Sequence, residues 1–275
     1  MNALICAVTG SNGYLGKTIV KTLRAQNYRV FELARDVKKA VLPEYFLPFS
    51  LHNSILPDLK NIDVLIHCAY DFSADTLEKS KKINLEGSMR LLHHAKACEV
   101  KKIIIISSMS AFEGTKSVYG KTKLALEKQA ALLGAIIVHP GLIFGENPQG
   151  IVGAMKKFVK KSPIVPLIGM GKQRFYPCFI DDLCQLIIYL MHHDVGTKPI
   201  IAANEKYLTF REIVLEFAKA ENKKVLLIPI PFTLLWAGLF LLEKLHIKIG
   251  LRSDSLIGAQ YYDKNPDFSR GFISV

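Results

Sequence analysis

The sequence predicts an α/β protein built on a doubly wound parallel sheet, with a smaller substrate-binding lobe at the C-terminal end. Over the first two-thirds of the chain, short β-branched runs alternate with helix-like segments, as in a parallel sheet covered on both faces. The runs 103–106 and 136–138 are apolar at consecutive positions, so each should be a strand buried on both faces. A glycine-rich turn also follows the first run directly and opens the first helix.

The same patterns predict the individual elements in order. Strands are expected at 3–8, 28–34, 62–68, 102–107 and 135–139, and helices near 15–26, 76–99 and 117–133. After Pro140, glycines and prolines crowd a loop and the alternation stops. We therefore expect a first domain over 1–145 to which 174–202 returns, and a second lobe made of 146–173 and 203–275.

Composition places the chain among ordinary folded proteins, since 50% of its 275 residues are hydrophobic and 22% are charged. Its cysteines are dispersed without a C-x-x-C pair, which argues for reduced thiols and against a disulfide scaffold or a zinc site: Cys6, Cys68, Cys98, Cys178 and Cys184. The histidine pairs at 93–94 and 192–193 lack metal-ligand spacing. We find no signal-peptide pattern and expect a cytoplasmic protein without a bound metal.

The formal net charge is +12, and the basic residues come mostly as pairs spread over many segments. Because they are not interleaved with aromatic residues, a nucleic-acid groove is poorly supported. The excess charge favours anionic ligands, such as phosphorylated cofactors and substrates.

The longest stretch without a charge is 225–242. Pro229 and Pro231 interrupt it, so we expect a buried strand, a turn and a core helix rather than a membrane span. A helix that lies in a membrane interface is the alternative.

The turn Thr9-Gly10-Ser11-Asn12-Gly13-Tyr14-Leu15-Gly16 predicts a dinucleotide site in a Rossmann-type sheet. Gly10 permits a tight turn, Gly13 lets the backbone approach a pyrophosphate, and Gly16 lets the helix pack on the strand. The helix N-terminus offers free N–H groups to the phosphates. The second strand ends at Ala34-Arg35. Since an arginine there suits the 2′-phosphate of NADP and a carboxylate suits NAD, Arg35 favours NADP, with NAD as the alternative.

The pattern Tyr119-x-x-x-Lys123 is the most informative motif for catalysis. On a helix over 117–133 the two side chains share one face, and a lysine cation beside a tyrosine favours the ionised phenol. Ser107 and Ser108 close a buried strand about a dozen residues earlier, at the sheet edge where ligands bind. We expect Tyr119 to move a proton, Lys123 to tune it, and Ser108 to hold the reacting oxygen, with Ser110 as the reserve for that role.

Taken together, these motifs resemble the extended short-chain dehydrogenase/reductase family, in its NAD(P)-dependent epimerase/dehydratase branch. The resemblance covers most of the chain and includes 63–69, 84–87, 139–145 and 179–183. It implies that the cofactor also contacts Cys68, Ala69, Asn84, Ser107, His139, Pro140, Gly141 and Ile143, besides Asn12, Tyr14, Leu15 and the catalytic pair Tyr119 and Lys123. It further implies that Arg174 holds a substrate pyrophosphate, and that the protein is a homodimer.

Departures from the family pattern are His139 in place of an arginine and Ser50 in place of an aspartate of the adenine pocket. Met109 and Ser110 follow Ser108 without an acid, which argues against a 4,6-dehydratase.

Three functions remain open at this point. The leading hypothesis is an epimerase or keto-reductase that acts on a nucleotide-linked sugar. The second is a reductase of a lipid-like or aromatic carbonyl compound, motivated by the apolar segment 232–242. The third is a cofactor-binding subunit or NADP sensor without catalysis, against which the intact Tyr119/Lys123 pair argues.

Overall fold

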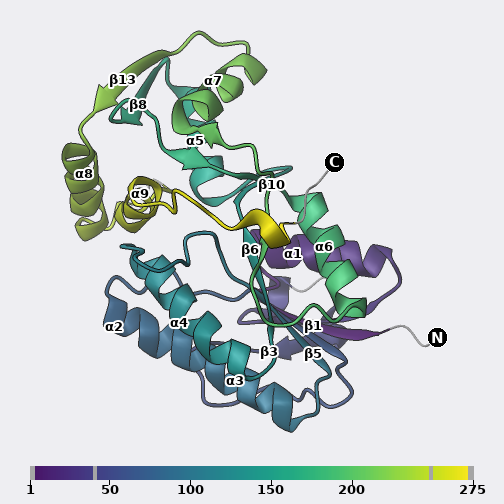
Figure 1. Ribbon diagram of the computed structural model, residues 1–275. Coiled ribbons are helices and arrows are strands. Elements are labelled where there is room, and N and C mark those ends of the chain that lie inside the picture. The colour runs from purple at the N-terminus through teal and green to yellow at the C-terminus, as the bar shows by residue number, and fades with distance from the viewer. Residues whose placement is uncertain (1–3, 40–41, 248–249, 272–275) are drawn as a thin grey trace.

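A seven-stranded parallel sheet forms the centre of the computed structural model, which describes residues 4–39, 42–247 and 250–271 (Figure 1). Its strand order is β11-β6-β5-β4-β1-β2-β3. The strands are β1 (Ile5–Thr9), β2 (Arg29–Ala34), β3 (Phe46–Pro48), β4 (Val64–His67), β5 (Lys102–Ile106), β6 (Ile136–Pro140) and β11 (Ile200–Ala202). The order reverses between β1 and β4, which creates the crevice where such sheets bind ligands.

Helices cover both faces of this sheet because successive side chains of each strand point to opposite sides. Cys6 and Val8 of β1 pack with Ile19 and Leu183, whereas Ala7 packs with helix residues on the other face such as Leu91, Leu92 and Leu126. The first face carries α1 (Tyr14–Ala25) and α6 (Ile180–His192). The second carries α2 (Leu77–Ser80), a π-helical turn (Lys81–Leu85), α3 (Glu86–Ala97) and α4 (Val118–Leu132). The doubly wound α/β prediction is confirmed.

The second lobe has its own apolar core, in which Val159, Leu167, Ile213 and Leu256 are almost fully buried. Its main elements are α5 (Gly150–Lys161), β8 (Ile164–Ile168), α7 (Phe210–Ala220), β13 (Leu226–Ile230), α8 (Phe232–Lys244) and α9 (Ser253–Gln260). β8 and β13 form a parallel pair. Short pairs join β7 (Leu142–Phe144) to β10 (Pro177–Phe179) and β9 (Arg174–Phe175) to β12 (Leu208–Thr209).

Several details differ from the expected elements. Three 3-10 turns (Val37–Lys39, Pro43–Tyr45 and Phe268–Arg270) and the edge strand β3 were not predicted. Phe268 packs on Tyr176, with ring centroids 5.2 Å apart, so the chain returns to the first domain near its C-terminal end. Arg174 and Phe175 pair with β12 of the second lobe. Position 3 of the first predicted strand lies outside the described residues.

Residues 225–242 form the expected strand, turn and helix, but the expected burial of these elements is wrong. β13 exposes Leu226 and Ile228, and Leu239 is the only buried residue of α8, which spans thirteen residues. The uncharged sequence was interpreted as core, but this segment forms the outer surface of the second lobe.

Candidate active site

A glycine turn joins β1 to α1 at the point where the strand order reverses. Gly10 has a φ of +66°, and a Cβ there would lie 3.1 Å from the backbone of Ala69. A Cβ on Gly16 would lie 2.4 Å from the carbonyl oxygen of Gly10, so neither position accepts a side chain without backbone movement. Gly13 is the N-cap residue of α1 and provides no side-chain cap. The first N–H groups of α1 are therefore available to a ligand.

A cavity of about 790 Å³ opens beside this turn. Two residues of the turn that line the cavity carry a buried polar atom with no hydrogen-bond partner among the described residues: Asn12 Oδ1 and Tyr14 Oη. Buried polar atoms are normally paired, so such atoms mark a place where a ligand supplies the partner. Many residues predicted to hold the cofactor line the cavity: Gly10, Asn12, Gly13, Tyr14, Leu15, Gly16, Arg35, Cys68, Ala69, Ser107, Tyr119, Lys123, Pro140, Gly141 and Ile143. The cavity and its open helix N-terminus fit a dinucleotide.

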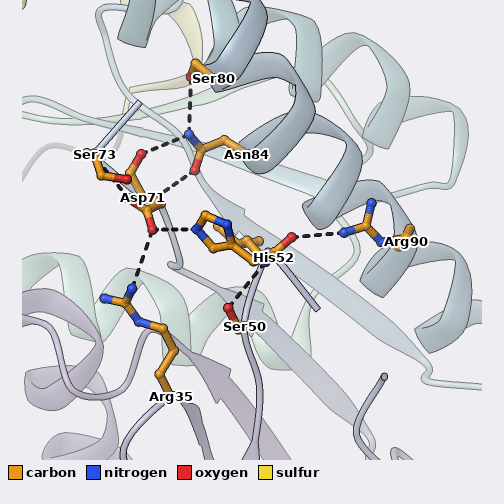
Figure 2. A network of polar contacts seen from close by, with 9 residues as sticks. Arg35, Ser50, His52, Asp71, Ser73, Ser80, Asn84 and Arg90 are labelled. Atoms are coloured by element: carbon orange, nitrogen blue, oxygen red, sulfur yellow. Dashed lines mark hydrogen bonds and ion pairs between the residues drawn. The ribbon is translucent and has the colours of Figure 1, made fainter. Parts of the chain in front are cut away.

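One end of this cavity carries a charged cluster, shown in Figure 2. His52 Nε2 lies 2.9 Å from Asp71 Oδ2, and the guanidinium of Arg35 lies 3.5 Å from the same oxygen. Burial acts to raise the pKa of Asp71, but hydrogen bonds from Ser73 and His52 outweigh it and lower that pKa to about 2. The carboxylate of Asp71 is thus ionised beside Arg35, whose side chain is 73% exposed.

Asn84 holds the loop that carries Asp71 rather than lining the cavity. Its Oδ1 accepts a hydrogen bond from the backbone N–H of Asp71 at 2.6 Å, and its Nδ2 donates to the carbonyl of Asp71 at 3.0 Å (Figure 2). Asn84 is buried within the π-helical turn, and π-turns are frequent at functional sites. It therefore shapes the charged end of the cavity through the backbone of Asp71.

The predicted catalytic side chains come together where β5 ends and α4 begins. Ser108 and Tyr119 both line the dinucleotide cavity and also a second cavity of about 300 Å³. The ammonium of Lys123 donates to the carbonyl oxygen of Ile106 at 2.8 Å and lies 6.0 Å from the ring centre of Tyr119. Ser110 and Arg174 line the second cavity. The two cavities thus meet at Ser108 and Tyr119.

Residues 6–202 match the model of the NAD dependent epimerase/dehydratase family. The chain belongs to this family. It is an NAD(P)-dependent enzyme of the extended short-chain dehydrogenase/reductase type.

The similar proteins share only about a quarter or less of their residues with this chain. The ceramide reductase of Caulobacter vibrioides is 26% identical over 239 residues, which are 82% of this chain and 74% of the relative. The bovine (Bos taurus) decarboxylating sterol-4-alpha-carboxylate 3-dehydrogenase is 24% identical over 239 residues, covering 74% of this chain and 66% of the relative. The UDP-glucose 4-epimerase of Thermus thermophilus, solved with NAD, superposes with a TM-score of 0.70 at 19% identity, over 83% of this chain and 86% of that one.

Protonation in this epimerase/dehydratase site follows burial. Burial and the neighbouring Tyr70 raise the pKa of Tyr119 above its usual value, and a hydrogen bond with Ser108 opposes the rise only in part. Burial lowers the pKa of Lys123 to about 8. The sequence led us to expect a lysine cation that favours the ionised phenol, but without cofactor the phenol is the favoured form.

Several side chains around Tyr119 were not predicted from the sequence. The two carboxylate oxygens of Asp254 accept from the backbone N–H groups of Val118 and Tyr119 at 2.7 and 3.0 Å. Phe72 stacks on the ring of Tyr119, with centroids 5.7 Å apart, and Tyr70 meets it edge-on at 4.8 Å. Asp254 belongs to α9, so the second lobe caps the helix that carries the tyrosine.

His139, for which the family resemblance implies a cofactor contact, lies near the end of β6 and lines neither cavity. Its Nε2 lies 2.9 Å from Oε1 of the buried Glu127, which also accepts a hydrogen bond from the Ser107 hydroxyl. Ser107 and His139 thereby tie β5 and β6 to α4 beneath the site. This buried cluster positions the strand ends from which Ser108 and Pro140 reach the cavities.

Proposed function

We propose that this enzyme reduces a carbonyl compound with NADPH and that Tyr119 is the proton donor. The position of Ser108 and Tyr119 between the two cavities carries the proposal. A bound nicotinamide would supply the hydride. The Ser108 hydroxyl donates a hydrogen bond to the carbonyl oxygen, and the phenol of Tyr119 gives its proton to that oxygen as the C–H bond forms, so the product is an alcohol.

The phenol of Tyr119 carries its proton at neutral pH, as a donor must. Burial raises its pKa further and so makes it a weaker acid, which means that proton transfer needs a group that stabilises the tyrosinate. The tyrosinate left after transfer is stabilised by the nearby Lys123 ammonium, which the carbonyl of Ile106 holds in place. A solvent proton then restores the phenol.

For the substrate we propose a lipid-like carbonyl compound. The second cavity is lined largely by apolar side chains, among them Met109, Leu142, Ile151, Phe175 and Tyr176. Such walls favour an apolar substrate, whose burial stabilises the complex by about 25 cal/mol per Å². The names of the ceramide reductase and sterol dehydrogenase relatives agree with this class.

A nucleotide-linked sugar is the second candidate, as the sequence led us to expect. Arg174 and Arg252 both line the second cavity, and a guanidinium is suited to a pyrophosphate. Arg174 lies over the ring of Tyr207, 4.5 Å from its centre, which holds the guanidinium in place. The likeness to UDP-glucose 4-epimerase extends to this lobe.

The two substrate classes are distinguished by NADPH oxidation with two panels, long-chain keto lipids in mixed micelles and UDP-linked keto-sugars. The proposal expects turnover of the lipids and little effect of Arg174→Ala. Turnover of the sugars alone, lost by about tenfold or more in Arg174→Ala, would replace the lipid with the second candidate. Turnover of neither panel by a protein that binds NADPH would contradict both.

For the cofactor we propose NADP, held by Arg35 through the adenosine 2′-phosphate. Asp71 opposes this role because its carboxylate lies 3.5 Å from the Arg35 guanidinium and would repel a phosphate. Fluorescence titration should show that Arg35→Ala weakens NADPH about tenfold without changing NADH, and that Asp71→Asn tightens NADPH. Equal affinities for the two cofactors in the wild type would instead favour NAD.

A further inference from the structure

α8 presents an apolar stripe to solvent. Leu234, Leu241 and Leu245 are 66, 59 and 60% exposed, and Ala237 lies between them. Their spacing of three, four and four residues places them on one face of the helix. The opposite face, with Leu235 and Leu239, packs on the core of the second lobe. An amphipathic surface helix turns a polar face outward, so the outer face of α8 has the wrong polarity for contact with water alone.

The parallel β8–β13 pair, whose second strand leads into α8, carries further exposed apolar side chains. Leu226 is paired with Ile164, and these side chains are 62 and 48% exposed. Ile228, two residues further along β13, is 39% exposed on the same face. In Figure 1 β13 leads into α8 along the outer edge of the second lobe, and β8 lies beside β13. Large exposed apolar patches of this kind mark interaction sites.

The surroundings of this patch are strongly basic. Segments 150–168 and 221–245, which contain the helices and strands of this surface, hold seven lysines against two acidic residues, Glu221 and Glu243. The carboxylate of Glu243 accepts from the N–H and hydroxyl of Ser253 and is half-buried. Lys223 donates to the carbonyl of Lys160, which brings the lysine pairs at 160–161 and 223–224 together at the start of β8 and β13. Lys244 lies at the far end of α8, over the ring of Phe240.

We propose that α8 and the outer face of β8 and β13 dock on a lipid bilayer that carries anionic headgroups. An apolar stripe flanked by lysines binds such an interface by burying the stripe at the acyl boundary while the lysines meet the headgroups. Two copies of this chain would bring their lysine flanks together, so the charge favours an anionic surface over self-association. Among the described residues no helix is long and apolar enough to cross a membrane.

This docking has a consequence for the active site. α8 packs on α9, and α9 contributes Asp254, Ser255 and Gly258 to the lining of the second cavity. A docked lobe therefore brings the substrate cavity to the bilayer that stores apolar substrates. The inference goes beyond the proposed function and does not depend on it, since vesicle binding is measured without substrate or turnover.

The test is sedimentation of the full chain with vesicles of phosphatidylcholine alone and of phosphatidylcholine with phosphatidylglycerol. Leu241→Glu is compared with Leu132→Glu, a matched change at an exposed leucine (86%) of α4 in the first domain. NADPH affinity and circular dichroism verify that both variants fold.

We expect binding to the anionic vesicles that weakens with salt, and a loss of affinity of at least about tenfold in Leu241→Glu but not in Leu132→Glu. Absence of vesicle binding, or binding that Leu241→Glu leaves intact, would overturn the proposal. A dimer that Leu241→Glu dissociates, without vesicle binding, would overturn it in favour of a second copy.

Discussion

Asp254 links the second lobe to the helix that carries Tyr119, the proposed proton donor, and its replacement should impair both stability and turnover. In Asp254→Asn the side chain keeps its shape but loses its charge and one acceptor oxygen. The wild-type carboxylate accepts from two backbone N–H groups, of Val118 at 2.7 Å and of Tyr119 at 3.0 Å. Ser117 caps only the N–H of Gly120, so it does not replace Asp254.

The cost follows from these two bonds. A hydrogen bond to a charged group contributes about 1.5–3 kcal/mol, and a side-chain cap about 1 kcal/mol. Asp254 is half-buried, so water replaces part of the interaction. We expect a loss of about 2 kcal/mol in the free energy of unfolding for Asp254→Asn, a decrease of about 4–8 °C in Tm.

The assay combines thermal unfolding with steady-state kinetics and NADPH titration. Asp254 acts through the backbone of Tyr119, so kcat should fall about tenfold while the Kd of NADPH changes less than about twofold. Thr209→Ala is the matched control, since Thr209 caps α7 in the same lobe and lines neither cavity. It should lower Tm without lowering kcat. A wild-type kcat in Asp254→Asn would refute the positioning role, and an unchanged Tm would refute the cap.

Three further changes test the cofactor site and its electrostatics. Gly16→Ala places a Cβ 2.4 Å from the Gly10 carbonyl oxygen. It should weaken the binding of NADPH and of NADH by at least about tenfold in fluorescence titration. Unchanged affinity would show that the turn does not hold the phosphates. Asn84→Ala removes two hydrogen bonds to the Asp71 backbone, so it should lower the free energy of unfolding in denaturant by about 1–2 kcal/mol. It should also weaken the binding of both NADPH and NADH. Weaker binding of only one of them would contradict the role of Asn84 in holding the loop. Lys123 has its pKa lowered to about 8 in the folded protein, so the unfolded chain binds more protons between pH 8 and 10.5. The unfolding free energy of the wild type should therefore rise relative to that of Lys123→Met across this pH range, by up to about 3 kcal/mol. A difference between the two proteins that does not change with pH would contradict the lowered pKa of Lys123.

The central sheet could be predicted because its strands carry their own signal. The run 103–106 is apolar at every position since both faces of β5 are covered by helices. β3 gave no comparable signal, because it is three residues long, ends at Pro48 and lies at the sheet edge.

The clustering of Ser108, Tyr119 and Lys123 could be predicted because the spacing of Tyr119 and Lys123 and the position of Ser108 are local features. Asp254 could not, since it reaches Val118 from 136 residues further along the chain and has no motif of its own. Asp71 and His52 likewise meet only through the folded loops after β3 and β4. The conditions that set the pKa of Tyr119 are also absent from the sequence, because burial and not the i+4 lysine dominates them.

The error over residues 225–242 has a physical reason. α8 is apolar on nearly every side, and such a helix is normally buried. Periodicity cannot reveal which half of a uniformly apolar helix meets the core. The position of α8 at the edge of a small lobe decides this, and the sequence carries no local mark of that position.

The most direct test of the account is the effect of Tyr119→Phe on NADPH oxidation with the substrate found in the two-panel screen. General acid catalysis contributes about 10²–10⁴-fold, so kcat should fall by that amount while the Kd of NADPH stays within about twofold. Tyr28→Phe, whose hydroxyl meets His192 away from both cavities, should retain full turnover. Undiminished turnover by a folded, NADPH-binding Tyr119→Phe protein would contradict the claim that Tyr119 is the proton donor.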